Sequence, residues 1–335
     1  MLKFLGRLVL VATLVAMVAA GMLAWGWQRV TGRGPLAEDR IVLIERGSGV
    51  ARIAGELAGS GVVSDPYTFR AAVRLFAGDR PLRAGEYQFP AHLSPRQAVE
   101  QMLEGRVVQH RITVPEGLTS AQVIELLRGI DLLEGEVGAI PGEGSLLPET
   151  YQIVRGDRRD ELVHRMQEAM TAAVAELWPK RRPGLPLAST ADAVVLASIV
   201  EKETGVATER PRVAAVFLNR LDRGMRLQSD PTVIYGLTGG KAASVANGEG
   251  VLGRALTRAD LAQPGPYNTY VIDGLPPGPI ANPGRDALQA VLEPLETDEL
   301  YFVADGTGGH AFSRTLEEHN RNVARWRKIQ GQGSD

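Results

Sequence analysis

Cysteine is absent from the 335 residues, which excludes disulfides, thiol catalysis and Cys-ligated zinc. The sequence also lacks a His-Glu-x-x-His spacing, a Gly-Lys-Ser/Thr phosphate loop and a dinucleotide-binding glycine motif. His310 and His319 are nine positions apart, and packing or hydrogen bonding explains them better than a metal. We therefore expect neither a cofactor nor a metal.

An excess of charge of one sign is lacking too, because 37 basic residues face 39 acidic ones and the formal charge is −2. Nothing in this balance indicates nucleic acid as a partner. The chain is 44% hydrophobic and 23% charged, and its length allows a membrane segment, a small domain and a larger core.

Residues 8–27 contain no charged side chain, and this stretch of roughly 20 residues is enough for a helix to cross a bilayer. Two basic residues lie in 1–7, so the positive-inside rule predicts a cytoplasmic tail there and an external location for the rest. Trp25 and Trp27 suit the membrane interface. A small-residue segment at 18–20 leaves a cleaved signal peptide as the alternative. We favour a retained single-pass anchor, because the apolar run continues past that segment.

The remaining chain predicts an α+β protein of two domains. Residues 28–39 are polar and contain glycine and proline, which is typical of a linker. Residues 40–105 predict the order strand, helix, helix, strand, which resembles LysM-like glycan-binding modules; a plain spacer without a ligand is the alternative. Residues 106–335 predict a larger mixed α+β domain, in which we expect the functional site.

A carboxylate at the end of a short apolar helix is the main chemical signal. A capping box at Ser189 and a stop at Gly205 predict this helix, and Glu201 lies near its C-terminal end. The residues three, four and seven positions before Glu201 carry no charge. Burial and the negative end of the helix dipole would raise the pKa of Glu201, as a general acid needs. The alternative is an exposed charged cluster with Lys202 and Glu203.

Two later segments, 227–236 and 266–270, combine amide, hydroxyl and tyrosine side chains with turn residues. Such side chains suit a sugar-binding cleft, because they match sugar hydroxyls and cover the apolar face of the ring. Asn219 lies in an otherwise apolar helix and needs a partner, either a backbone carbonyl or substrate.

Together these residues resemble the membrane-anchored endolytic murein transglycosylases, and the match runs through most of the chain. It is carried by Ala197-Ser-Ile-Val-Glu-Lys-Glu-Thr204, by 216–221, by Met225-Arg-Leu-Gln-Ser-Asp-Pro-Thr-Val-Ile-Tyr-Gly236, by Tyr267-Asn-Thr-Tyr270 and by 274–284. The resemblance implies a bacterial inner-membrane enzyme with a periplasmic catalytic domain at 106–335. It implies that glycan strands of peptidoglycan are cut internally at MurNAc-GlcNAc bonds to leave 1,6-anhydroMurNAc ends. Peptidoglycan synthases are the implied protein partners.

The resemblance also implies site residues. Glu201 would be the catalytic acid/base, and lytic transglycosylases pair such a Glu with a Gln-containing segment and a Tyr-Asn segment. The residues predicted to bind substrate are Asn219, Gln228, Ser229, Asp230, Thr232, Tyr235, Tyr267, Asn268, Thr269, Tyr270 and Asn282.

One acid is enough for this reaction. Retaining and inverting glycosidases need two carboxyl groups, and Glu203 is about 200° around the helix from Glu201. In a lytic transglycosylase the muramyl C6 hydroxyl attacks C1 intramolecularly, so a single Glu can act first as acid and then as base. One alternative is a non-catalytic, membrane-tethered glycan-binding scaffold. A pyridoxal-phosphate lyase is a second, but it would need a lysine beside a phosphate-binding loop.

Overall fold

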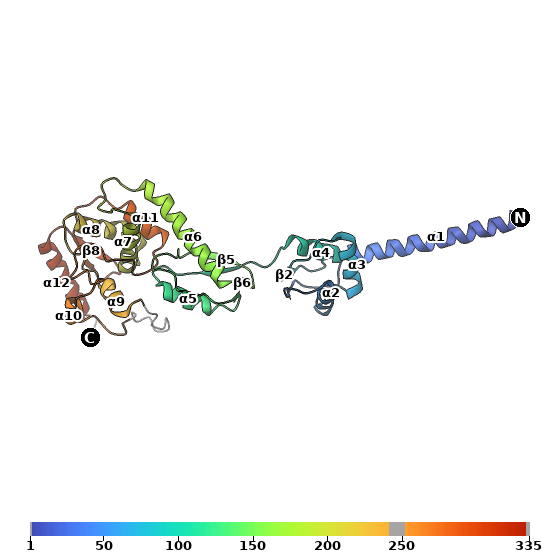
Figure 1. Cartoon of the computed structure of the whole chain (residues 1–335), viewed down its shortest axis with the longest axis horizontal. Coiled ribbons are helices and arrows are strands. Elements are labelled where there is room, and N and C mark those ends of the chain that lie inside the picture. The colour runs from blue at the N-terminus through green and yellow to red at the C-terminus, as the bar shows by residue number, and fades with distance from the viewer. Residues whose placement is uncertain (1, 241–251, 333–335) are drawn as a thin grey trace. The chain divides into compact units, whose positions relative to one another are not determined.

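The computed structural model describes residues 2–240 and 252–332, and it divides into two compact units. Unit 1 comprises Met1–His110 with Gln152–Gly156, and unit 2 comprises Arg111–Tyr151 with Asp157–Asp335. Both units combine helices with short strands, and a long apolar helix begins the described chain (Figure 1). The predicted α+β class and the N-terminal apolar helix are confirmed.

Helix α1 spans Leu2–Thr31, and its part Phe4–Thr31 is long and apolar enough to cross a membrane. The helix extends beyond the predicted span 8–27 at both ends, and its last turns pack on α3 and α4 of the same unit. Trp27 lies against Phe76 with ring centroids 6.0 Å apart, and Val30 is 4% exposed in the core of that unit. The segment predicted as a linker is therefore helical at its start and anchored to the folded unit.

Unit 1 pairs β1 with β2 in antiparallel register, so that Val42 lies opposite Tyr87. The predicted order of strand, two helices and strand is present, and a capped helix, α4, follows it. Phe69 and Tyr87 are fully buried in the core, and Tyr87 donates its hydroxyl to the Arg83 carbonyl at 2.7 Å. The elements are β1 Arg40–Ile44, α2 Val50–Gly59, α3 Pro66–Phe76, β2 Gly85–Phe89 and α4 Pro95–Glu104.

Unit 2 is mainly helical, and it contains two small two-stranded sheets, in which β4 pairs with β6 and β7 with β8. Strands β3 and β5 each include residues of both units. The strands are β3 His110–Thr113, β4 Leu133–Glu134, β5 Thr150–Ile153, β6 Asp157–Arg158, β7 Tyr301–Ala304 and β8 His310–Ser313. The helices are α5 Ser120–Arg128, α6 Arg159–Leu177, α7 Thr190–Glu203, α8 Arg210–Asp222, α9 Asp230–Thr238, α10 Arg258–Ala262, α11 Arg285–Leu292 and α12 Leu316–Gln332, with short 3-10 turns η1 Trp178–Lys180 and η2 Ala207–Glu209.

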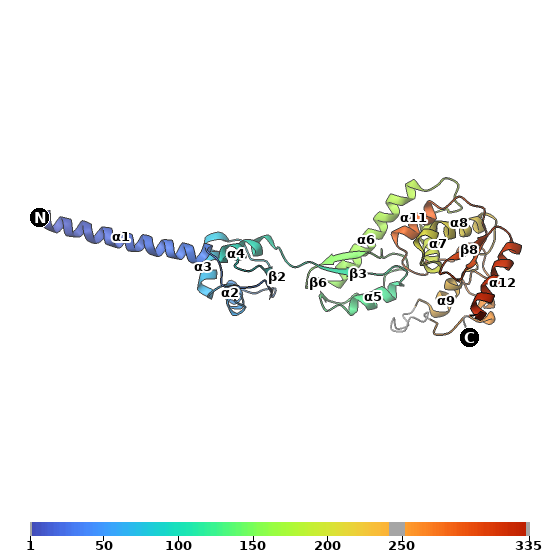
Figure 2. The ribbon, with the colours of Figure 1, turned by 180° about the vertical axis from the view of Figure 1, so that it is seen from behind.

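Helices α7, α8 and α11 pack on one another in the core of unit 2 (Figure 2). Helix α7 is apolar on most of its surface, so it is buried on several sides, and the predicted capping box between Ser189 and Asp192 begins it. Phe217 of α8 meets Phe302 of β7 edge to face, with ring centroids 5.7 Å apart. This packing holds the C-terminal end of α7, where Glu201 and Glu203 lie.

Candidate active site

Glu201 lies in an ion-pair network rather than among uncharged groups. Its side chain is 5% exposed, and it accepts hydrogen bonds from the Gly284 N–H at 2.8 Å and from Arg210 Nη2 at 3.2 Å. Arg210 also contacts Glu116 and Asp286. Burial raises the pKa of Glu201, as expected, although Gly284 and Arg210 act in the opposite direction. The expectation of uncharged surroundings, which considered only the neighbours within α7, was therefore wrong, because α8 brings Arg210 to this carboxylate.

Glu203 points away from Glu201, as the helix geometry predicts, and it lines a cavity of about 480 Å³. Ser229 donates its hydroxyl to Glu203 at 2.5 Å, and burial raises the pKa of Glu203 to about 7. A carboxyl group with such a pKa keeps its proton up to neutral pH, which suits a general acid.

Three of the residues predicted to bind substrate share this cavity with Glu203: Gln228, Asp230 and Tyr270. Tyr270 donates its hydroxyl to Asp230 Oδ1 at 2.6 Å. Burial, followed by this bond, raises the pKa of Tyr270, so the phenol stays protonated and continues to donate. Of the two predicted polar segments, the structure therefore brings Gln228, Asp230 and Tyr270 to the cavity at Glu203.

The loop that carries Gln228 is tied to the Tyr267–Tyr270 segment by hydrogen bonds. Gln228 has a left-handed backbone with φ of 54°, and its N–H donates to the Thr269 carbonyl at 3.1 Å. The Ser229 N–H donates to Thr269 Oγ1 at 2.9 Å, and the hydroxyl groups of Thr232 and Thr269 are hydrogen-bonded to each other at 2.8 Å. A left-handed conformation is costly for a non-glycine residue and needs such support. The bonds hold Gln228 at the cavity.

The predicted asparagines are engaged with the protein backbone. Asn219 donates to the Thr297 and Glu299 carbonyls at 2.7 and 3.0 Å. Of its two predicted partners, a backbone carbonyl or substrate, the structure shows the backbone carbonyl. Asn282 is fully buried, and its Oδ1 accepts from the Leu146 N–H at 2.9 Å. Substrate binding by these amides stays a prediction; the contacts observed here hold loops in place.

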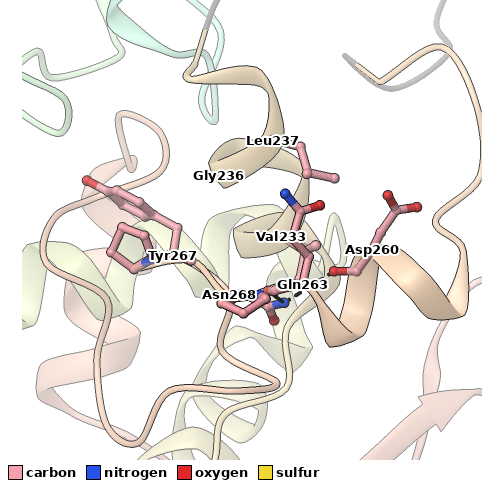
Figure 3. A pocket seen from close by; sticks show the side chains of 10 residues that line it. Val233, Gly236, Leu237, Asp260, Gln263, Tyr267 and Asn268 are labelled. Carbon is pink, nitrogen blue, oxygen red and sulfur yellow. Dashed lines mark hydrogen bonds between the residues drawn. The ribbon is translucent and has the colours of Figure 1, made fainter.

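Tyr267 and Asn268 line a second, smaller pocket of about 80 Å³ beside α9 (Figure 3). Tyr267 also packs against Tyr235 with the rings tilted and their centroids 4.8 Å apart, and Tyr235 donates its hydroxyl to the half-buried Glu143 at 3.3 Å. Burial raises the pKa of Glu143. The Tyr-Asn-Thr-Tyr segment thus has Tyr270 at the large cavity and Tyr267 at the small pocket.

Asn268 is the clearest positioning residue of that segment. Its Nδ2 donates to the carbonyls of Asp260, Leu261 and Gln263 at 3.2, 3.0 and 2.8 Å, and its Oδ1 accepts from the Tyr270 N–H at 3.0 Å. Figure 3 shows this amide turned towards the chain around Gln263.

Replacing Asn268 by Ala is expected to lower the free energy of unfolding by about 1–3 kcal/mol, because buried backbone groups would lose their partners. Urea unfolding measures the change. Asn320→Ala removes an exposed amide and serves as the matched control, with an expected change within about 0.5 kcal/mol. Equal midpoints for the two variants would contradict the positioning role.

Besides Glu203 and Leu227, sequence reasoning missed four residues on the cavity wall: Arg220, Phe302, Val303 and His319. Of these four, Arg220 could have been noticed in the sequence, because a charged residue next to the apolar run of α8 needs a buried partner or a site. The other three come from β7 and α12, far along the chain, and carry no local signal of a site.

Comparison with known proteins identifies the family of this chain. The model of the YceG-like family matches residues 42–325. A Bacillus subtilis (strain 168) protein named endolytic murein transglycosylase is 30% identical over 309 residues, covering 83% of this chain and 82% of that protein. A Streptococcus pneumoniae (serotype 2, strain D39) protein of the same name is 27% identical over 329 residues, and the match spans 57% of its length.

A crystal structure of a putative yceG-like protein from Listeria monocytogenes is 31% identical, with a TM-score of 0.49 over 85% of this chain and 99% of that one. The family match covers most of the chain, from β1 to α12. This protein therefore belongs to the YceG-like family.

Proposed function

We propose that this protein is an endolytic lytic transglycosylase that cuts MurNAc-GlcNAc bonds within peptidoglycan strands and leaves 1,6-anhydroMurNAc ends. One observation carries the proposal: a carboxyl group with a pKa of about 7, Glu203, lines a cavity together with Gln228, Asp230 and Tyr270. The names of the Bacillus and Streptococcus relatives support the same activity.

Glu203 is the better candidate for the acid/base, although the sequence hypothesis selected Glu201. Glu203 reaches the cavity and accepts a bond from a neutral hydroxyl, so it can hold and release a proton there. Glu201 pairs with Arg210 and accepts the Gly284 N–H at the start of α11, which favours a structural carboxylate that links α7, α8 and α11.

In this mechanism Glu203 first protonates the glycosidic oxygen, and the bond from that oxygen to C1 breaks as positive charge develops on the muramyl ring. The Glu203 carboxylate then removes the proton from the C6 hydroxyl, whose oxygen bonds to C1. Asp230, oriented by the Tyr270 hydroxyl, would stabilise the developing charge. The Gln228 amide would bind a sugar hydroxyl or acetamido group. No water is activated, so no second base is needed.

The proposal includes a location. Helix α1 would be retained as a single-pass anchor in the bacterial inner membrane, with the N-terminus in the cytoplasm and both folded units in the periplasm. There the enzyme would meet nascent strands from peptidoglycan synthases and release or terminate them. The small domain, predicted at 40–105, would bind glycan in the manner of LysM modules.

Mass spectrometry of purified glycan strands, incubated with the full chain in detergent, tests the activity. The expected products end in 1,6-anhydroMurNAc, because the C6 hydroxyl is the nucleophile. Reducing ends would instead indicate a hydrolase that activates water with a second carboxylate. Intact strands would favour the alternative of a non-catalytic, membrane-tethered glycan-binding scaffold.

A further inference from the structure

Arg220 lies on the wall of the large cavity and has no role in the proposed mechanism. This residue is 8% exposed, and it donates from Nε to the Leu300 carbonyl and from Nη1 to the Leu227 carbonyl, both at 2.7 Å. Within the described part of the chain, Nη2 has neither a hydrogen-bond partner nor an enclosed position. The guanidinium is thus held rigidly, with one donor nitrogen left for a ligand.

His319 provides a second donor on the same wall. Its ring stacks on Tyr301 with centroids 5.2 Å apart, and its Nδ1 is enclosed without a partner among the described residues. Burial, together with the charge of Arg220, lowers the pKa of His319, which favours the neutral ring. A proton on the enclosed Nδ1 would be an unsatisfied buried N–H, and this favours the tautomer with the proton on Nε2, the nitrogen open to solvent.

The rest of the lining decides which ligand these donors suit. Phe302 and Val303 add an apolar surface beside them, while Asp230 and Glu203 lie in the same cavity. The Asp230 side chain would repel a carboxylate ligand, whereas a neutral carbonyl oxygen can accept from the two donors without that cost. A carbonyl with a methyl group attached matches both the two donors and the apolar surface.

We propose that Arg220, His319, Phe302 and Val303 form a subsite for the acetamido group of an N-acetylated sugar. The carbonyl oxygen of that group accepts from Arg220 Nη2 and His319 Nε2, and its methyl contacts Phe302 and Val303. This inference rests on the proposed function, since it deepens the choice of glycan strands as substrate. It assigns recognition of the 2-substituent to side chains of β7, α8 and α12, which share the cavity with Gln228, Asp230 and Tyr270.

The test uses full-length Glu203→Gln protein in detergent, so that no sugar is cut, and calorimetric titration with two neutral tetrasaccharides. Chitotetraose carries an acetamido group on every ring, and cellotetraose carries hydroxyls in their place. We expect tighter binding of chitotetraose, and we expect adding His319→Ala to reduce that preference by about tenfold. His319→Gln keeps an N–H donor and should retain part of the preference. Arg220 is left unaltered because its other bonds hold Leu300 and Leu227.

Cellotetraose affinity and the thermal midpoint serve as internal controls, since neither should change greatly in the His319 variants. An unchanged preference after His319→Ala, or no binding of chitotetraose at all, would overturn the subsite. The proposed function fails on a different result, namely the absence of strand cleavage by the protein with Glu203 intact. If the enzyme cuts strands but His319→Ala leaves the preference for chitotetraose unchanged, only the subsite proposal fails.

Discussion

Replacement of Glu203 by Gln is expected to lower the rate of glycan-strand cleavage by about 10²–10⁴-fold, the usual contribution of a general acid/base. Gln keeps the size of the side chain and can still accept the 2.5 Å bond from Ser229, but it has no proton to transfer at neutral pH. The loss should therefore fall on kcat rather than on folding. Rates of anhydro-product formation, measured by mass spectrometry, give the comparison.

Glu201→Gln is the matched control, because the two residues lie at the same end of α7. Its neutral amide weakens the pairing with Arg210, so we expect a lower free energy of unfolding and a smaller loss of activity than for Glu203→Gln. A folded Glu201→Gln protein that is as inactive as Glu203→Gln, or more so, would return the acid/base role to Glu201.

The rate of cleavage is expected to fall about tenfold per pH unit above about 7, because the acid step needs protonated Glu203 and burial raises its pKa to that value. The measurement is kcat/KM between pH 5 and pH 9, which reports on the free enzyme. A rate that stays constant across pH 7 would contradict a protonated Glu203 as the acid.

The same pKa predicts how stability depends on pH. The folded state keeps the Glu203 proton more tightly than the unfolded chain, whose carboxyl group has the ordinary value of 4.5. The stability contributed by this group is thus fully present below about 4.5 and is lost as the pH rises through about 7. Between these values, wild type should lose urea resistance relative to Glu203→Gln, which has no group to titrate there. Parallel curves for the two proteins would contradict the shift.

Local patterns were enough for much of the fold. The capping box at Ser189 and the uncharged run in α1 act within a few residues of chain, so the helices that they begin or form could be read directly from the sequence. The two polar segments at 227–236 and 266–270 were also recognisable, because their composition is unusual, and hydrogen bonds do join them. What composition could not show was the function of each polar atom within them.

Asn268 illustrates that limit, since the sequence shows an amide but not the three backbone carbonyls that accept hydrogen bonds from it. Arg220 illustrates another, because its partners Leu300 and Leu227 come from separate parts of the chain. Partners of this kind are set by which loops and strands meet in space. A single sequence does not show which distant segments are in contact in the folded chain.

The choice between Glu201 and Glu203 depends on the same difference. The sequence specifies that both carboxylates end α7 and that they face different directions, since helical spacing fixes the angle between them. It does not specify what lies in each direction. Arg210 folds over Glu201, whereas Gln228, Tyr270 and His319 surround the cavity at Glu203. Burial and neighbouring charge set the pKa of a carboxyl group, and both arise from segments that meet only when the chain is folded.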